Sequence, residues 1–471
     1  MSNSTKKLFG TDGVRGEAGR FPLDQNTLRT VGASLAAHLK TNSSTQPLIV
    51  VGRDTRESGP WLEKALSEGA LQAGAQVRSA GVITTPGVAF LARSLPANAG
   101  VVISASHNSY QDNGFKIFAP SGRKLDDETE RLIEADIRNQ KPSATDGGSP
   151  IEGRGETETA RRGAIPKQSE QRALALQARY LDFLEREIGA GLLLSGLSIV
   201  IDAANGAASA LAPELFRRLG ASVIAINDEP DGRNINRNCG SLHLEQLQQK
   251  VVAESADLGV AFDGDADRAL FVDSQGHYVD GDATLWVLSN YMRERNQLRN
   301  DLVVATVMSN IGLEIALRSL GLQLVRTDVG DKYVLDELIR SGASLGGEQS
   351  GHIIFPSLSL AGDGIITTLC LLRAIIDGRR PLHELTVGFV RYLQVLLNVE
   401  VTEKRPFDEV EEIKKAVAET QAQLGDHGRL LLRYSGTEPL ARIMIEGDDQ
   451  SSIEGLARNV AAAIDQALGT S

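Results

Sequence analysis

The sequence contains little of what several large classes of protein require. Only two of its 471 residues are cysteines, Cys239 and Cys370, and their separation excludes a motif of closely spaced thiols. Aromatic residues make up 4%, which argues against stacking platforms for single-stranded nucleic acid. The formal net charge of −12 argues against DNA as a partner. Because no apolar run is long enough to span a bilayer and no secretory signal is present, we expect a cytoplasmic protein without a membrane partner.

An internal repeat indicates an α/β protein of several domains. Hydrophobic residues make up 41% and charged residues 23% of the chain, and its length allows three or four domains. A unit of strand, loop, helix, glycine and strand is predicted in residues 48–82, with similar units in residues 198–223 and 302–324. Alternating strands and helices favour mostly parallel sheets with helices on both faces. Ligands of such sheets bind at the carboxyl ends of the strands, so we expect the functional loops there.

The last part of the chain changes character. Residues 394–447 predict a strand, a helix and two strands, and a helix follows from Ser451 to Leu468. Residues 141–172 are rich in Ser, Thr, Gly and charge, and they lack an apolar period, which predicts a linker. We therefore expect three similar mixed α/β domains and a smaller α+β C-terminal domain. The predicted bounds are 1–172, 173–277, 278–390 and 391–471.

One stretch places reactive side chains at the end of a predicted strand. Val101–Ile103 is a short β-branched run, after which the chain turns through Ser106 and His107. A second turn at residues 112–114 leads to Lys116, which apolar residues flank. An exposed hydroxyl with an imidazole and an amine nearby suits a nucleophile or a phosphoryl carrier. Taken alone, the stretch is better explained as a polar turn with a packed histidine, and other stretches change that balance.

Three carboxylates follow another predicted strand. Asp263, Asp265 and Asp267 alternate along a tight turn, in which Gly264 allows a sharp bend. Such carboxylates can converge on a hard cation, and Mg²⁺ prefers these oxygen ligands and leaves positions for phosphate or water. The adjacent Arg268 can hold a phosphate oxygen. The alternative is a surface acidic turn, but three acids in five residues would repel one another without a cation or a basic partner.

Two further loops carry groups suited to a sugar phosphate. Glu348 and Ser350 stand two residues apart, so in extended backbone they can point the same way toward sugar hydroxyls or an amine. Near the C-terminus an arginine, hydroxyl groups and a glycine form a plausible phosphate cradle, although no Walker-type nucleotide loop is present. The cradle consists of Arg433, Ser435, Gly436 and Thr437. Each loop alone is about equally well explained as a polar turn or strand edge.

Together these loops offer a hydroxyl carrier, a cation site and two anion sites, which fits the movement of a phosphoryl group on a sugar. The motifs SASHN, DGDADR, GGEQSGH and RYSGTEP resemble, in this order, the phosphoserine, metal, sugar and phosphate loops of the α-D-phosphohexomutase superfamily. The resemblance covers essentially the whole chain. FGTDGVRG, Gln349 and VGDKYVLDEL are most similar to the bacterial phosphoglucosamine mutases.

The resemblance implies four domains around a central cleft and an intramolecular phosphotransferase that interconverts glucosamine 6-phosphate and glucosamine 1-phosphate. Ser106 would be phosphorylated by a kinase or by autophosphorylation, and glucosamine 1,6-bisphosphate would be the intermediate. The Ser106 phosphate would hold one Mg²⁺ together with Asp263, Asp265 and Asp267. Lys116 and Arg15 would lie beside the phosphoryl group. The remaining implied roles are proton transfer or positioning by His107 and His352, phosphate binding by Arg268, sugar binding by Glu348 and Ser350, and binding of the non-reacting phosphate by Arg433, Ser435, Gly436 and Thr437.

Other interpretations of the same residues stay open. A phosphomannomutase or phosphoglucomutase would use the same chemistry. A metal-dependent phosphatase would use an aspartate nucleophile, with Asp263 and Asp265 as its motif, and a non-catalytic sugar-phosphate sensor would use no chemistry at all. The chain also departs from the family's pattern in two places. Ser109 stands where proline is usual, which predicts a less rigid serine loop, and the linker of residues 141–172 is longer than expected.

Overall fold

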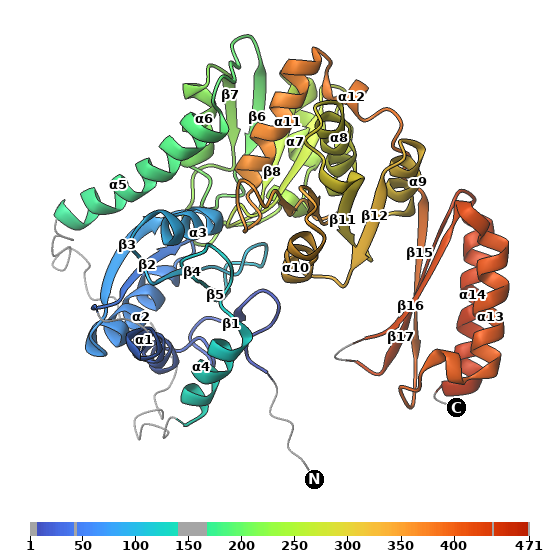
Figure 1. Cartoon of the computed structure of the whole chain (residues 1–471), viewed down its shortest axis with the longest axis horizontal. Helices are drawn as coiled ribbons and strands as arrows, with labels where there is room; N and C mark the ends of the chain where they lie inside the picture. The colour runs from blue at the N-terminus through green and yellow to red at the C-terminus, as the bar shows by residue number, and fades with distance from the viewer. Residues whose placement is uncertain (1–6, 42–44, 140–166, 436–437, 470–471) are drawn as a thin grey trace.

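In the computed structural model, which describes residues 7–41, 45–139, 167–435 and 438–469, four units follow one another in an arc (Figure 1). Each unit is built on its own sheet, with strand orders β1-β5-β4-β2-β3, β10-β9-β8-β6-β7, β12-β11-β13-β14 and β15-β17-β16. We call these units domains 1 to 4. The expected architecture of three similar α/β domains and a smaller α+β domain is confirmed.

Domain 1 combines a parallel centre with an antiparallel edge, because β2 pairs in parallel with β3 and β4, whereas β5 is antiparallel to both β4 and β1. Its elements are β1 (Val14–Glu17), α1 (Gln25–Thr41), β2 (Leu48–Arg53), α2 (Gly59–Gln72), β3 (Gln76–Val82), α3 (Thr85–Ser94), β4 (Ala99–Ile103), β5 (Asp112–Phe118) and α4 (Asp127–Asn139).

Domain 2 repeats this arrangement after a connecting helix, α5 (Lys167–Phe183), which packs along β3 of domain 1. Its elements are β6 (Ser198–Asp202), α6 (Leu211–Arg218), β7 (Ser222–Ile226), α7 (Glu245–Ala253), β8 (Leu258–Phe262), β9 (Ala269–Asp273) and β10 (Tyr278–Val279). The segment expected to be a linker through Arg172 is therefore wrong at its end, because residues 167–172 are helical. Residues 140–166 of that segment lie outside the described part of the chain.

Domain 3 repeats the arrangement with shorter final strands. Its elements are α8 (Gly281–Glu294), β11 (Leu302–Thr306), α9 (Ile311–Ser319), β12 (Gln323–Thr327), α10 (Asp331–Ser341), β13 (Gly346–Gly347), β14 (Ile353–Ile354), α11 (Gly364–Gly378) and α12 (Leu382–Leu385). Domain 4 has an antiparallel sheet with two helices against one face (Figure 1). It consists of β15 (Leu393–Glu400), α13 (Glu411–Leu424), β16 (Arg429–Tyr434), β17 (Leu440–Gly447) and α14 (Gln450–Leu468).

The first three domains share one strand order. Numbered from the first parallel strand of each domain, the strands lie in the order fourth, third, first, second: β5-β4-β2-β3, β9-β8-β6-β7 and β14-β13-β11-β12. In each domain the third strand is parallel to the first and antiparallel to the fourth. The connection between the third and fourth strands therefore occupies the same place in every repeat, at the carboxyl end of a central strand.

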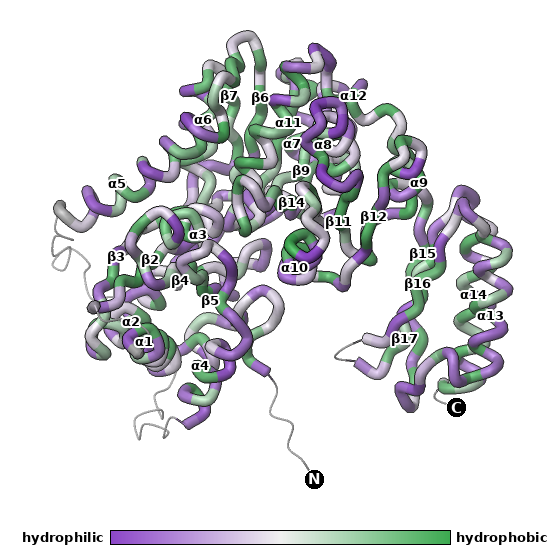
Figure 2. The backbone as a smooth tube through the Cα atoms, in the orientation of Figure 1, coloured by the Kyte–Doolittle hydropathy of each residue, from purple (hydrophilic) through white to green (hydrophobic). Residues whose placement is uncertain are grey.

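Hydrophobic packing joins the first three domains and leaves domain 4 with a core of its own. One large cluster extends from Val102 in domain 1 through Tyr180 of α5 to Phe262 in domain 2 and Leu313 in domain 3. A separate cluster in domain 4 packs the sheet against α13 and α14 around Ile443. Figure 2 shows hydrophobic residues along β6, β11 and β12 and hydrophilic residues on the outer turns of many helices. In the described residues, every helix is too short or too polar to cross a membrane.

Candidate active site

Three loops that the sequence singled out occupy equivalent positions in the fold. The serine loop, residues 104–111, joins β4 to β5, and the acid loop, residues 263–268, joins β8 to β9. The sugar loop, residues 348–352, joins β13 to β14. Each loop connects the third and fourth strands of its repeat. The three connections meet where domains 1, 2 and 3 adjoin, as the contacts below describe.

Ser106 adopts a left-handed backbone conformation at the centre of the serine loop. Its φ of 53° costs a non-glycine residue roughly 1–2 kcal/mol, so surrounding contacts must hold it. The Ser106 amide donates to Ser104 Oγ at 2.9 Å, and Ser104 Oγ donates to Asp54 at 2.6 Å. The fully buried Arg56 pairs with the same Asp54 at 2.8 Å and donates to loop carbonyls, including that of Ser109. Thus the loop that has Ser109 in place of proline is held from inside by an arginine.

The Ser106 hydroxyl faces the acid loop. Ser106 Oγ donates to Asp263 Oδ2 at 2.5 Å, and His107 Nδ1 lies 3.4 Å from the same hydroxyl. The expectation of an exposed hydroxyl is wrong, because Ser106 has an exposed fraction of 0% and Lys116 of 1%. The polar end of each side chain faces carboxylates of domain 2, which accept hydrogen bonds from Ser106 Oγ and from Lys116 Nζ.

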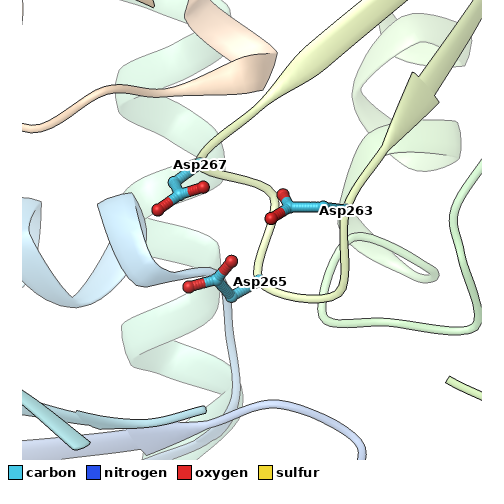
Figure 3. A group of neighbouring side chains, drawn as sticks. All are labelled: Asp263, Asp265 and Asp267. Carbon is cyan, nitrogen blue, oxygen red and sulfur yellow. The ribbon is translucent and has the colours of Figure 1, made fainter. Parts of the chain in front are cut away.

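The three acids form one compact buried cluster. One carboxylate oxygen from each of Asp263, Asp265 and Asp267 lies within 4.8 Å of the others, and all three side chains are buried. Figure 3 shows the carboxylates around a common space, carried by the turn between β8 and β9. The turn places Ala266 at a φ of 57° and so brings alternate side chains to one side. The alternative of a surface acidic turn is excluded by this burial.

The cluster suits a divalent cation because two of its carboxylate oxygens have no hydrogen-bond partner. Asp265 Oδ1 and Asp267 Oδ1 are buried and have no hydrogen-bond partner, whereas their second oxygens accept from Lys116 Nζ at 3.1 Å. Thr85 Oγ1 also donates to Asp265 Oδ2, at 2.5 Å. Buried carboxylate oxygens without partners are costly unless a cation or donor reaches them. Oxygen-only donors on a tight turn are the ligands that Mg²⁺ prefers.

Burial and neighbouring charges shift the pKa values of Asp263 and Asp267 in opposite directions. Burial, together with the charges of Asp267 and Asp265, raises the pKa of Asp263 well above its ordinary value. Burial would also raise the pKa of Asp267, but Lys116 and His352 outweigh it and hold that pKa well below its ordinary value. Burial opposes the charged form of Lys116, yet the neighbouring carboxylates raise its pKa further. Positive and negative side chains are therefore in close contact in this site, and the carboxyl group of Asp263 is the one whose ionisation is opposed.

Two arginines adjoin the serine and acid loops. Arg15 donates to Asn108 Oδ1 at 3.2 Å and pairs with Asp12, while Arg268 Nε is buried without a hydrogen-bond partner. The backbone amide of Arg268 donates to Asp263 Oδ1 at 3.3 Å. Burial, and then Arg268 and Arg15, lower the pKa of His107 to about 4, so its imidazole is neutral at pH 7. The arginines and the neutral imidazole surround the Ser106 hydroxyl from domains 1 and 2.

The sugar loop approaches the acid loop from domain 3. His352 Nδ1 lies 3.7 Å from Asp267, and His352 Nε2 lies 3.8 Å from Asp331. Burial would lower the pKa of His352, but Asp267, Asp331 and Glu348 together raise it to about 9. Glu348 Oε1 accepts from the amide of Gly330 at 3.1 Å, and Ser350 Oγ is buried without a hydrogen-bond partner. The loop thus offers an unsatisfied hydroxyl and a carboxylate beside the cluster.

An ionic bridge that the sequence did not reveal joins domains 1 and 3. Lys124 Nζ lies 3.0 Å from Asp12 and 2.7 Å from Asp331, and both residues of the latter pair are mostly covered. A cavity of 420 Å³ lies beside this bridge, and Lys116 and His352 are among the residues that line it. Asp12 belongs to the motif FGTDGVRG and Asp331 to the motif VGDKYVLDEL. Lys124 has no sequence signal, because the chain returns it to the site through backbone contacts after β5.

The phosphate loop of domain 4 stands apart from the other three loops. Arg433 is exposed and Ser435 is buried, while Gly436 and Thr437 lie outside the described residues. Within the part of the chain that the structure describes, no hydrogen bond or ion pair joins Arg433 or Ser435 to the other loops. Arg442 lies beside this loop, and sequence reasoning did not single it out. Arg442 on β17 is paired directly with Arg433 on β16. Its Nη2 lies 3.4 Å from Ser435 Oγ, and its buried Nε lacks a hydrogen-bond partner.

Comparison with known sequences matches all four domains. Phosphoglucomutase/phosphomannomutase, alpha/beta/alpha domains I, II and III match residues 6–144, 178–276 and 280–392, and the C-terminal domain of the same family matches residues 396–463. The chain is 46% identical to a phosphoglucosamine mutase of Solibacter usitatus over 464 residues, which cover 98% of this chain and 99% of that protein. It is 45% identical to one of Symbiobacterium thermophilum, over 97% and 98% of the two chains.

Solved structures show the same fold at lower identity. A phosphoglucomutase/phosphomannomutase family protein from Burkholderia thailandensis superposes with a TM-score of 0.76 at 23% identity, over 98% of this chain and 97% of that one. N-acetylphosphoglucosamine mutase of Aspergillus fumigatus, solved in complex with GlcNAc-6P and magnesium, superposes with a TM-score of 0.61 at 19% identity. That alignment covers 98% of this chain and 96% of the fungal one. At these identities the superpositions show that the architecture is shared.

Proposed function

The chain belongs to the phosphoglucosamine mutase family, and from this premise we propose that it interconverts glucosamine 6-phosphate and glucosamine 1-phosphate through a phosphoserine at Ser106 and a bisphosphorylated sugar. One observation supports the assignment most. The Ser106 hydroxyl lies 2.5 Å from Asp263 in a buried three-carboxylate cluster, although the two loops are separated by more than a hundred residues in sequence. A carrier hydroxyl at a cation site is what phosphoryl transfer by a serine requires.

The residues that would hold the metal are Asp263, Asp265 and Asp267, with a phosphate oxygen on Ser106 as a further ligand. The fungal mutase was solved with magnesium, which makes Mg²⁺ the ion we propose for this cluster. A bound Mg²⁺ would supply neutralisation of the charge that develops on the transferring phosphoryl group. Lys116 orients Asp265 and Asp267 by donating to one oxygen of each, which leaves the other oxygen of each carboxylate available.

In the first transfer, the 1-oxygen of glucosamine 6-phosphate attacks the phosphorus on Ser106. The new bond joins phosphorus to the sugar 1-oxygen, and the bond between phosphorus and Ser106 Oγ breaks. The proton lost by the sugar hydroxyl must reach the leaving serine oxygen for the charges to balance. His107 suits this relay because its Nδ1 lies 3.4 Å from Ser106 Oγ. His352 suits a positioning role, since both of its ring nitrogens face carboxylates.

The second transfer runs in reverse on the other end of the sugar. The bisphosphate turns over and Ser106 Oγ attacks the 6-phosphorus. The bond between phosphorus and the 6-oxygen breaks, and the proton lost by the Ser106 hydroxyl passes to the 6-oxygen as glucosamine 1-phosphate forms. Because either phosphate must occupy either position, a second anion site away from the serine is needed. We assign that site to Arg433, Ser435, Gly436 and Thr437, while Arg268, Arg15 and Lys116 balance charge at the reacting phosphate. Glu348 and Ser350 would hold the sugar hydroxyls in both orientations.

The enzyme must first receive a phosphate on Ser106. We propose that a kinase or autophosphorylation supplies it, after which glucosamine 1,6-bisphosphate keeps the enzyme phosphorylated. The proposed compartment is the cytosol, where unpaired thiols such as Cys239 and Cys370 stay reduced.

A coupled assay with glucosamine 6-phosphate, Mg²⁺ and catalytic glucosamine 1,6-bisphosphate tests the proposal. We expect turnover that exceeds the turnover on glucose 1-phosphate and mannose 1-phosphate. Comparable rates on glucose 1-phosphate would contradict the glucosamine assignment. Release of inorganic phosphate without isomerisation would instead indicate a phosphatase.

A serine substitution tests the carrier directly. Intact-mass measurement after incubation with the bisphosphate should show one added phosphoryl group on the wild-type chain and none on Ser106→Ala. Ser109→Ala is the matched control, because Ser109 lies in the same loop with an exposed side chain and contacts Arg56 only through its carbonyl. It should keep both the added mass and the turnover. A phosphorylated Ser106→Ala chain would remove Ser106 from the role of carrier.

A further inference from the structure

A side chain of domain 2 is bonded to the backbone of the serine loop. Asn236 Nδ2 donates to the carbonyl of Ser106 at 2.8 Å and to the carbonyl of Asn108 at 2.9 Å. Asn236 itself has a left-handed φ of 57°, and its amide donates to the carbonyl of Ala204 at 2.9 Å. The amide group is therefore presented by a fixed turn of domain 2 to two carbonyls on either side of His107.

The same two carbonyls are held from the other side by domain 1. Arg56 Nη2 donates to Ser106 O at 3.0 Å and to Asn108 O at 2.8 Å. Its Nη1 donates to Asp112 O and Ser109 O, and its Nε to Asp54, so all five guanidinium N–H groups are used. Each of the two carbonyls thus accepts one bond from Arg56 and one from Asn236. The left-handed Ser106 is fixed between the two donors.

The acid loop meets the serine loop at this junction. A Cβ atom added to Gly264 would lie 2.6 Å from the Ser106 carbonyl oxygen and 2.9 Å from Asn236 Nδ2. The backbone of the acid loop at Gly264 therefore packs against the hydrogen bond between Asn236 and the Ser106 carbonyl. In the same place the hydroxyl of Ser106 reaches Asp263 of that loop.

We propose that Asn236 is a positioning residue that sets the serine loop in register with the acid loop across the boundary between domains 1 and 2. The inference rests on the proposed function for its catalytic consequence, but the contact itself does not. Phosphoryl transfer requires in-line placement of the phosphorus, and a displacement of about 1 Å costs about a hundred-fold in rate. Arg56 shapes the loop within domain 1, whereas Asn236 connects the loop to the domain that carries the acids.

The loop of domain 2 offers a matched control. Asn238 lies two residues further along, has a φ of 55°, is exposed, and makes no described side-chain contact. Asn236→Gly removes the amide and tolerates the left-handed backbone, and Asn238→Gly makes the same change where no bond is lost. Asn236→Asp keeps the size of the side chain but cannot donate, so a carboxylate oxygen would face two carbonyls.

Hydrogen–deuterium exchange of the full-length chain tests the contact without any substrate. We expect a peptide spanning residues 104–112 to exchange at least about ten-fold faster in Asn236→Gly than in wild type, because the amides of Ser106, Asn108 and Asp112 are protected within the loop. Asn238→Gly should exchange like wild type. Equal exchange in wild type and Asn236→Gly would overturn the inference whatever the enzyme's activity.

Steady-state kinetics with glucosamine 6-phosphate test the consequence. We expect kcat of Asn236→Gly to fall roughly 30- to 100-fold with KM within about three-fold of wild type, and Asn236→Asp to lose more. Asn238→Gly should keep wild-type values. A KM change without a kcat change would overturn the positioning role. If the wild type itself shows no mutase turnover, the proposed function fails, and the exchange comparison alone decides the contact.

Discussion

Asn310 Nδ2 donates to Glu446 Oε1 at 3.1 Å, and this contact joins domain 3 to domain 4. Asn310 caps the N-terminus of α9, and Glu446 lies on β17 with an exposed fraction of 0%. The other carboxylate oxygen accepts from the amide of Ile311 at 3.1 Å and from Arg429 Nε at 3.0 Å. Asn310 also exchanges bonds with the backbone of Tyr392 in the connecting segment. Domain 4, which has a hydrophobic core of its own, is therefore attached to domain 3 through a buried polar joint.

Removal of the Glu446 carboxylate should destabilise the chain. Glu446→Ala leaves the amide of Ile311 without its acceptor and Arg429 without its carboxylate partner, so we expect the free energy of unfolding to fall by roughly 3 kcal/mol. Urea denaturation followed by circular dichroism measures the change. Glu454→Ala is the control, because Glu454 forms an i,i+4 pair with Arg458 on the surface of α14, and it should shift the free energy by at most about 0.5 kcal/mol. Equal shifts would contradict the importance of the joint.

Magnesium should stabilise the folded chain through the acid cluster. A cation bound only to the folded state adds about 2.7 kcal/mol at a hundred times its dissociation constant. We expect Mg²⁺ to raise the melting temperature of wild type and of Asp408→Asn, whose side chain is exposed in domain 4. Asp265→Asn should show little increase, because one of the unpartnered oxygens is lost. Calorimetric titration of Mg²⁺ into the three proteins gives the affinities. Equal affinity in Asp265→Asn would contradict the assignment of the cluster.

Two ion pairs that join domains 1 and 3 should differ in coupling energy, because one is more covered than the other. Lys124 and Asp331 lie 2.7 Å apart with side-chain exposures of 18% and 17%, whereas Arg123 and Asp336 are equally close but about half exposed. Double-mutant cycles to alanine should give a coupling energy of about 2 kcal/mol for the covered pair. The exposed pair should give at most about 0.5 kcal/mol, since water screens it. The reverse order would contradict the burial argument.

Asp363 should make stability depend on pH in a defined direction. It caps α11 by accepting from the amides of Ile365 and Ile366, and Tyr180 donates to it at 2.6 Å. Burial raises its pKa from 3.8 to about 6 in the folded chain. The folded state therefore holds this proton more tightly than the unfolded state. The stabilisation is complete below pH 4 and is lost as pH rises through 6.

The measurement compares the melting temperatures of wild type and Asp363→Asn between pH 4.5 and 8. Asparagine keeps the cap but does not ionise. The stability of the variant relative to the wild type should therefore increase as the pH rises. The relative gain should be on the order of 2 kcal/mol across the window, because part of the effect already lies below pH 4.5. A constant difference, or one that shrinks toward high pH, would contradict the predicted sign.

The sequence predicted the repeated framework because local signals carry it. Apolar β-branched runs such as Leu48–Arg53 and Leu302–Thr306 form central strands, and a glycine, Gly74 or Gly321, lies two residues after the end of the following helix. The two-residue strand β13 is Gly346–Gly347 and has no such run, so pairing with β11 and β14 rather than propensity creates it. The start of α5 at Lys167 was missed for the same reason. Polar residues begin that helix, and only its later part packs on domain 1.

The site could be predicted as a set of residue types but not as a geometry. Reactive side chains at strand ends identified the serine, acid and sugar loops. The burial of Ser106 was not predictable, because its cover comes from Asp263, some hundred and fifty residues away in the chain. Asn236 and Lys124 each make only a few long-range contacts and leave no local pattern. Distances of this kind depend on how domains dock, which periodicity does not encode.

The placement of three loops between the third and fourth strands has a consequence for substitutions far from the cleft. Those strands are antiparallel neighbours, so a slip of one residue in their pairing would turn each side chain to the opposite side of its sheet. A change within β5 that moved Phe115 away from Ile103 would redirect the serine loop without altering any of its own residues. Inactivating substitutions should therefore also accumulate along the hairpin stems, among core residues such as Phe115 and Ile117.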